Sequence, residues 1–140
     1  MSIFPVVREG YVFILSALIL GGILGLAVHP YLAIPLVVLA FYFAYFFRNP
    51  KREIPSDPLA IVSPADGTVQ EVVSLDDDDF LKQRCKKVVI FLSVFDVHVN
   101  RSPIEGEIKI QKYVCGRFKP AYKDSVGFEN ERHMIGIENP

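Results

Sequence analysis

Two uninterrupted apolar stretches fill most of the first third of the 140-residue chain. Tyr11–Val28 contains 18 residues and Tyr31–Phe47 contains 17, and only His29-Pro30 separates them. Apart from His29, no residue within or between these stretches carries a charge near neutral pH. Because about 20 apolar residues cross the hydrocarbon core of a bilayer, the pattern predicts a transmembrane hairpin of two helices, at about 11–28 and 31–47.

Basic residues flank both outer ends of this predicted hairpin. Arg8 precedes the first apolar stretch, and Arg48, Lys51 and Arg52 follow the second. Positive charge collects on the cytoplasmic side of membrane proteins, so we expect both ends in the cytoplasm and His29-Pro30 on the opposite side. The expected location is therefore the cytoplasmic membrane, with the polar remainder of the chain on its cytoplasmic side.

Small residues in the first apolar stretch and aromatic residues in the second suggest how each would pack in a membrane. Ala17, Gly21 and Gly25 recur every four residues, which favours a face where a second helix approaches closely. The same glycines are also compatible with the general glycine enrichment of membrane helices. The aromatic-rich segment 41–47 is typical of an interfacial belt, although lipid-facing bulk would produce it equally well.

Beyond the hairpin, the pattern changes to a basic, proline-containing linker at 48–58 and then to short apolar runs separated by turns at 59–140. This alternation predicts a mainly β soluble domain, a sandwich or barrel-like fold. In one run, Ile108 and Ile110 alternate with polar residues, which indicates a half-buried strand. The acidic run Asp76–Asp79 is interpreted as a solvated hairpin tip. Strands are expected near 59–62, 68–73, 86–93 (a central strand), 106–113 and 134–137.

Composition narrows the possible partners. The net charge is −1, with 15 basic and 16 acidic side chains, so nothing favours a nucleic-acid surface. Cys85 and Cys115 lack neighbours at metal-ligand spacing and would remain reduced in the cytoplasm. No metal site is expected.

Polar side chains that could take part in catalysis follow one apolar run, in the stretch Phe91–Pro103. An acid, a histidine, an amide and a guanidinium occur between Asp96 and Arg101, as expected where a strand delivers polar groups to a site. A second acid, Asp66, lies in the turn-forming sequence Ser-Pro-Ala-Asp-Gly. Asp66 and His98 could form an acid–base relay, in which a carboxylate orients an imidazole. Each also has a purely structural interpretation, as a turn residue and as a core histidine.

The order and spacing of these motifs resemble the phosphatidylserine decarboxylases, particularly their short, membrane-anchored branch in bacteria and archaea. The sequences that carry the resemblance are Phe46–Pro50, Ser63–Val69, Phe91–Pro103 and Asn130–Arg132. The resemblance implies a self-cleaving precursor whose new pyruvoyl group acts as the electron sink when carbon dioxide leaves phosphatidylserine, or a serine ether lipid.

The resemblance also implies roles for particular residues. Asp66 and His98 would activate the serine for self-cleavage, and His98 would later assist decarboxylation. Arg101 and Lys123 are candidates for the lipid phosphate on charge alone. Asn130 and Arg132 match a family motif and would line the site.

One element of the family pattern is absent, because the sequence contains no Gly-Ser dipeptide. We therefore expect a β-chain portion, incomplete as a catalytic domain, that requires a pyruvoyl-carrying α-chain from the same precursor. Whether protomers associate is left open. The alternative is a membrane-anchored β-domain that acts as a binding or carrier module without catalysis.

Overall fold

The computed structural model describes residues 5–57, 60–77, 80–119 and 129–139. The chain divides into two compact units. The anchor unit comprises Met1–Ser56, Pro64–Gly67 and Leu92–Arg101. The strand unit comprises Asp57–Ser63, Thr68–Phe91 and Ser102–Pro140. Two of the sequence motifs, around Asp66 and His98, therefore belong to the same unit as the apolar helices.

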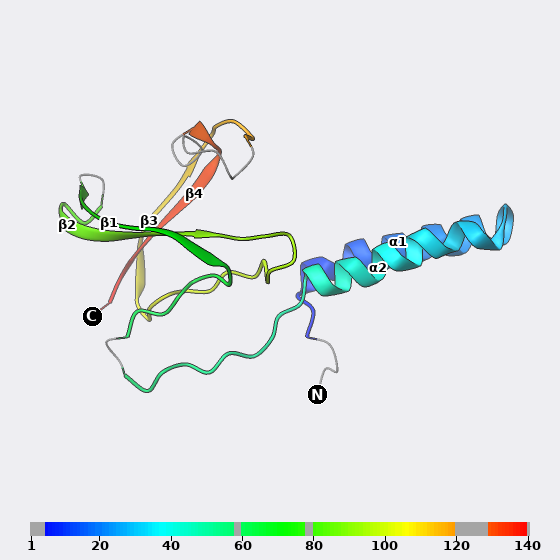
Figure 1. The fold of residues 1–140 in the computed structure, drawn as a ribbon, viewed down its shortest axis with the longest axis horizontal. Coiled ribbons are helices and arrows are strands. Elements are labelled where there is room, and N and C mark those ends of the chain that lie inside the picture. Colours follow the sequence, from blue (N-terminus) through cyan, green and yellow to red (C-terminus); the bar gives the residue numbers. More distant parts are fainter. Residues whose placement is uncertain (1–4, 58–59, 78–79, 120–128, 140) are drawn as a thin grey trace. The chain divides into compact units, whose positions relative to one another are not determined.

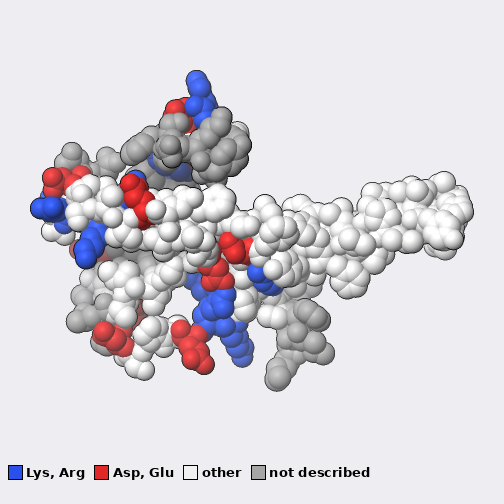
Figure 2. All heavy atoms as spheres, in the orientation of Figure 1, with Lys and Arg blue, Asp and Glu red and all other residues white. Residues whose placement is uncertain are grey.

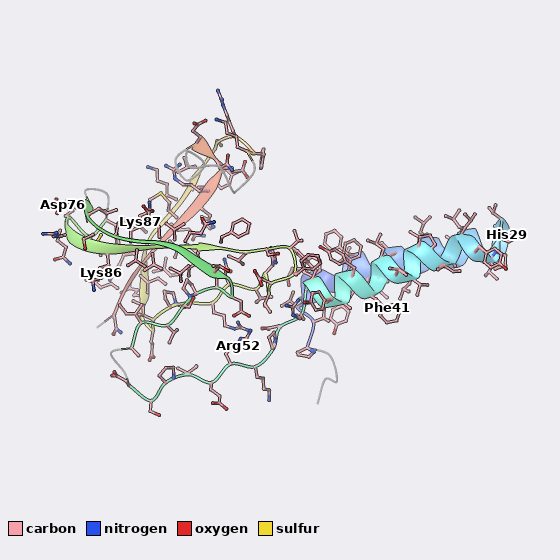
Figure 3. All side chains as sticks on the ribbon, viewed as in Figure 1. His29, Phe41, Arg52, Asp76, Lys86 and Lys87 are labelled. Atoms are coloured by element: carbon pink, nitrogen blue, oxygen red, sulfur yellow. The ribbon has the colours of Figure 1, made fainter. Side chains whose placement is uncertain are left out.

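Two helices form the main part of the anchor unit (Figure 1). Helix α1 spans Arg8–Ala27 and helix α2 spans Ala33–Phe46, with a short 3-10 helix, Pro30–Leu32, between them. Helix α1 is long and apolar enough to cross a membrane, whereas the apolar helical segment Pro30–Phe46 is shorter. The helices occur where the two apolar stretches predict them. His29 lies at the tip of the hairpin (Figure 3).

Small residues allow the two helices to pack closely. Ala17 and Gly21 on α1 and Ala40 on α2 are buried. A Cβ atom on Gly21 would lie 3.1 Å from the Cβ of Leu36, and one on Gly25 would lie 3.1 Å from the Cβ of Ala33. The expected small-residue face is thus confirmed as the surface that meets the second helix.

The open end of the helical hairpin is closed by main-chain pairing. Val6 and Arg48 form an isolated antiparallel bridge, and the Val7 N–H donates to the Phe47 carbonyl at 3.0 Å. The Phe47 ring also stacks on Phe13, with ring centroids 5.3 Å apart. Consequently, the chain before α1 and the chain after α2 are held together.

The strand unit contains two antiparallel hairpins. Strand β1, Thr68–Asp77, pairs with β2, Gln83–Phe91, and β3, Glu107–Val114, pairs with β4, Arg132–Glu138. Four of the predicted strands are therefore present.

Two expectations about this region need correction, and two are only partly tested. The described part of the expected strand at 59–62 is not a strand. Among the described residues, β2 pairs only with β1, so it is not central, and each sheet has two strands. The sandwich or barrel is thus not shown. Asp76 and Asp77 continue β1, and the remainder of the expected acidic tip lies outside the described residues.

The expected half-buried strand is also wrong. Ile108 and Ile110 on β3 are 58% and 37% exposed. A register shift between them interrupts the alternation, and no further sheet covers their face among the residues that the structure describes. Among the described residues, Phe80 approaches the second hairpin: a Cβ atom on Gly136 of β4 would lie 2.8 Å from the Phe80 ring. Both cysteines are free, as expected.

Candidate functional site

Two sequence motifs meet inside the anchor unit. The Arg101 N–H donates to the Pro64 carbonyl at 2.8 Å, which ties the turn containing Asp66 to the segment containing His98. A main-chain hydrogen bond of this kind constrains both segments, since neither belongs to a helix or sheet. The contact brings together two motifs that are separated by about thirty positions in the sequence.

A tight turn, Ser93–Asp96, follows β2 and precedes His98 in the chain. The Asp96 N–H donates to the Ser93 carbonyl at 2.8 Å, and the Asp96 carboxylate accepts from the Ser93 N–H, also at 2.8 Å. Beyond the turn, Val97 is only 3% exposed and the next residue, His98, is exposed. Burial of Val97 therefore fixes which way His98 faces, because neighbouring side chains in extended chain point in opposite directions.

The His98 ring has one stacking partner and one hydrogen bond. It stacks on Phe46, the last residue of α2, with centroids 4.3 Å apart and planes inclined by 25°. Its Nδ1 lies 3.1 Å from the Asp96 carbonyl oxygen. A carbonyl only accepts, so this contact requires a proton on Nδ1 and, in the neutral ring, leaves Nε2 with its lone pair. Within the described residues Nε2 has no hydrogen-bond partner.

Asp66 has a different partner from the one that the relay hypothesis requires. Its carboxylate forms an ion pair with Arg52, and both side chains are partly exposed. No hydrogen bond joins Asp66 to His98 among the residues that the structure describes. In this structure the orienting contact on the imidazole comes from the main chain at Asp96.

Arg101 holds the chain that follows α2. Its Nη2 donates to the Asn49 side-chain oxygen at 2.6 Å and to the Pro50 carbonyl at 2.8 Å. Both protons on this nitrogen are then used, which leaves Nη1 and Nε for any further ligand. The first residues of the predicted linker at 48–58 are thus held against the His98 segment.

Arg48 and Tyr45 hold the turn before His98. Arg48 Nη2 donates to the Phe95 carbonyl at 2.8 Å, and the Tyr45 hydroxyl donates to the same oxygen at 3.0 Å. The Arg48 guanidinium carbon also lies 3.8 Å from the centre of the Tyr45 ring. The end of α2 and the turn Ser93–Asp96 therefore form one local structure.

The other predicted site residues belong to the strand unit or lie outside the described chain. The Asn130 side chain bridges the Lys119 main chain, accepting from its N–H at 2.9 Å and donating to its carbonyl at 2.8 Å. Arg132 begins β4 opposite Val114 and is half-buried. Lys123 lies outside the described residues. Asn130 thus has a clear structural role, as a clamp on the segment after β3.

Sequence reasoning did not select Phe46, Asn49, Arg52 or Asp96 as site residues. Phe46 and Asn49 lie within the family-like sequence Phe46–Pro50, so a signal for them was available. Asp96 was noted as the acid of the candidate stretch, but no role was assigned to it. For Arg52 there was no local signal, because its partner lies 14 residues away.

Comparisons with known proteins agree with these motifs. A model of the phosphatidylserine decarboxylase family matches residues 39–140. A protein of Carboxydothermus hydrogenoformans is 43% identical over 133 residues, covering 95% of this chain and 62% of the relative. One of Symbiobacterium thermophilum is 45% identical over 132 residues, covering 94% and 61%. Both are named phosphatidylserine decarboxylase proenzyme. The chain spans about three fifths of these relatives, and no solved structure matches it.

Proposed function

This chain belongs to the phosphatidylserine decarboxylase family, and on that premise we propose that it supplies the membrane anchor and the acid–base histidine of a phosphatidylserine decarboxylase. The observation that carries the proposal is the His98 ring, which stacks on the last residue of the apolar helical hairpin and whose Nε2 has no hydrogen-bond partner within the described part of the chain. The product would be the corresponding ethanolamine lipid.

Membrane anchoring supports this choice of substrate. Helix α1 has the length and apolarity of a membrane span, and we propose that α1 and α2 insert together as a hairpin. Phe46 ends α2, so a group stacked on its ring would lie near the depth of the lipid headgroups. The basic residues at both ends of the hairpin favour the cytoplasmic side for this site.

His98 would move protons at two stages. In the precursor, Nε2 would accept the proton of the serine hydroxyl that starts self-cleavage, while Nδ1 stays bonded to the Asp96 carbonyl. During turnover, the same nitrogen would return a proton to the carbon that loses carbon dioxide. The pyruvoyl group, formed from a serine that this sequence does not contain, would supply the electron sink. The imidazole is exposed and its Nε2 has no partner among the described residues, which fits a site that the pyruvoyl group enters on another segment of the precursor.

Asp66 and Arg101 would support His98 and the substrate. Asp66 would stabilise the charged imidazole during cleavage, which requires its carboxylate to leave Arg52 or to act across it. Arg101 would use Nη1 or Nε for the lipid phosphate while Nη2 holds the linker. Lys123 is proposed for the same phosphate on its charge. Asn130 and Arg132 are proposed to line the site.

An α-chain from the same precursor is the proposed partner of the strand unit. Apolar strand residues that ordinarily lie in a core are more than half exposed here, namely Val69, Val72, Val88, Ile108, Tyr113 and Ile135. A partner that adds strands or a second layer would cover them.

The role of His98 can be tested in a precursor that carries the serine-bearing region. Replacing His98 with Ala should abolish self-cleavage, because it removes the group that is proposed to take the serine proton. His133→Ala is the matched control, since His133 is an exposed histidine on β4. Mass spectrometry of the purified products gives the fraction cleaved and identifies a pyruvoyl group on the smaller piece. Normal cleavage of the His98→Ala precursor would refute the proposed role.

The Asp66 contribution can be separated from that of its ion pair. Asp66→Asn should slow self-cleavage. Arg52→Met frees the carboxylate, so a direct action of Asp66 on His98 predicts cleavage at least as fast as in the unaltered precursor. Cleavage rates from quenched time courses measure both. Equal slowing by the two substitutions would instead indicate that the Arg52–Asp66 pair is itself required.

A further inference from the structure

We propose that the turn Ser93–Asp96, called here the Phe95 turn, inserts its apolar tip into the membrane interface beside the end of α2. The inference deepens the proposed function and rests on its membrane anchoring. The occupant of this surface is then a bilayer containing anionic phospholipid. The first observation is exposure, because Val94 is 54% exposed and Phe95 is 65% exposed at the tip of the turn.

The turn is fastened to the helix end that would enter the membrane. The Tyr45 hydroxyl and Arg48 Nη2 both donate to the Phe95 carbonyl, at 3.0 and 2.8 Å. Arg48 also donates through Nη1 to the Tyr45 carbonyl at 2.9 Å. These contacts place the apolar tip at the level of the last turn of α2 rather than leaving it free in solvent.

Several polar groups of the turn already have partners, which lowers the cost of insertion. The Asp96 carboxylate accepts from the Ser93 N–H, the Ser93 carbonyl accepts from the Asp96 N–H, and the Phe95 carbonyl has its two donors. Burial of unsatisfied polar groups is the main penalty for placing irregular chain in a membrane.

The surroundings match an interface in composition and charge. The outer surface of α2 is apolar up to this point, as at Phe41, which is 73% exposed and projects from the helix in Figure 3. Figure 2 shows the hairpin free of Lys, Arg, Asp and Glu along its length on the visible face, with charge only near its base. The basic side chains that follow α2 are Arg48, Lys51 and Arg52. Aromatic rings with basic neighbours are typical of the headgroup region.

The consequence concerns how His98 meets its substrate. His98 follows the Phe95 turn by two residues and stacks on Phe46. If both flanking elements are seated in the interface, a serine headgroup reaches Nε2 while its acyl chains remain in the bilayer. The Phe95 turn thus sets the depth at which the histidine operates.

The absence of tryptophan from the sequence makes a direct test possible. Phe95→Trp creates a single-tryptophan full chain, to be reconstituted in vesicles of phosphatidylcholine and phosphatidylglycerol. We expect a blue-shifted emission and strong quenching by lipids brominated near the headgroup, with weaker quenching by lipids brominated near the chain end. Val94→Trp is a second reporter in case the first variant folds poorly.

Two further single-tryptophan variants distinguish the ways in which the inference could fail. Phe41→Trp, on α2, reports insertion of the hairpin, and Phe118→Trp, 83% exposed in the strand unit, reports a solvent-exposed aromatic. Quenching at Phe41→Trp without quenching at Phe95→Trp and Val94→Trp would overturn the inference but leave the anchor intact. No quenching at any position would overturn the membrane anchor itself. A blue shift that depends on protein dilution and is insensitive to brominated lipid would mean that a second copy covers the turn, which also overturns the inference.

Discussion

The helical hairpin of the anchor unit and the β-hairpins of the strand unit differ in which of their apolar residues are buried and in what could cover the rest. In the helical hairpin, every fourth residue of α1 is small where α2 approaches, so Ala17, Gly21 and Ala40 are buried between helices whose main-chain hydrogen bonds are internal. In the β-hairpins, apolar residues such as Val72 and Ile108 remain 60% and 58% exposed. The helices also expose large apolar side chains, such as Leu26 at 93%, but only a bilayer is needed to cover them because their main-chain hydrogen bonds are internal. A two-stranded sheet needs another layer of protein.

The contrast predicts that adding volume between the helices is costly. Gly21→Leu should destabilise the hairpin by about 1–3 kcal/mol, because its Cβ would already lie 3.1 Å from the Leu36 Cβ. Gly22→Leu is the matched control, since a Cβ atom there meets nothing within 4 Å. The measurement is the midpoint of SDS-induced unfolding in mixed micelles, followed by energy transfer between probes on the two helices. Equal midpoints for the two variants would contradict the close packing.

In the strand unit, stability should depend on specific polar contacts instead. Asn130→Ala removes both hydrogen bonds to the Lys119 main chain and should lower local stability by about 1–2 kcal/mol. Asn130→Asp retains the acceptor for the Lys119 N–H but sets a carboxylate oxygen against the Lys119 carbonyl, so it should lose at least as much. Hydrogen exchange of the β3 and β4 amides measures the effect. Unchanged protection in the Ala variant, combined with impaired processing of the precursor, would favour the substrate-lining role over the clamp.

Polar replacement of the exposed strand residues should have little effect in this chain alone. Val72→Thr and Ile108→Thr are each expected to change stability by less than about 0.5 kcal/mol, since both side chains are already exposed. Each should nevertheless weaken association with a serine-bearing α-chain. Ile54→Thr, at an 85% exposed position in the anchor unit, is the control. Sedimentation of mixtures of the separated chains measures association, and equal binding by all three variants would argue against the proposed contact surface.

The smallest predicted effect is a loss of stability of the strand unit at alkaline pH. A hydrogen bond from Lys109 to Glu107 is the largest cause that raises the pKa of Lys109 above its ordinary value of 10.5. A hydrogen bond with Glu131 likewise raises the pKa of Tyr113 above 10.0. Both groups hold their proton more tightly when folded, so their stabilisation is full below these ordinary values and lost as pH rises through the raised ones. The thermal unfolding midpoint of the strand unit should therefore fall at strongly alkaline pH. The fall should be smaller in the Lys109→Met variant. An identical alkaline decline in that variant would remove Lys109 as a cause.

The sequence predicted the parts of this structure that depend on local pattern. The uncharged run from Tyr11 to Phe47 sufficed for both helices, and β-rich runs sufficed for the four strands. The alternation of Ile108 and Ile110 suggested a buried face, but a period of two cannot reveal whether another layer is present to cover it.

Asp66 and His98 belong to the same unit of the structure, but the motifs did not reveal the contacts that each of them makes. The imidazole is oriented by the main-chain carbonyl of Asp96, a group that every residue possesses, so no side-chain pattern could identify it. Arg101 contacts Asn49 across 52 positions of sequence, and spacing carries no information at that range.

The pairing that closes the helical hairpin also bears on the order in which the protein is made. Contacts between α1 and α2, and the hydrogen bond from Val7 to Phe47, lie entirely within the first 48 residues. This segment can therefore fold while the remainder is still being synthesised, because its contacts require no later part of the chain. If the hairpin inserts into the membrane as proposed, the Asp66 turn and the His98 segment would then dock one after the other onto a hairpin that is already inserted. Assembly of the site would thus follow membrane targeting.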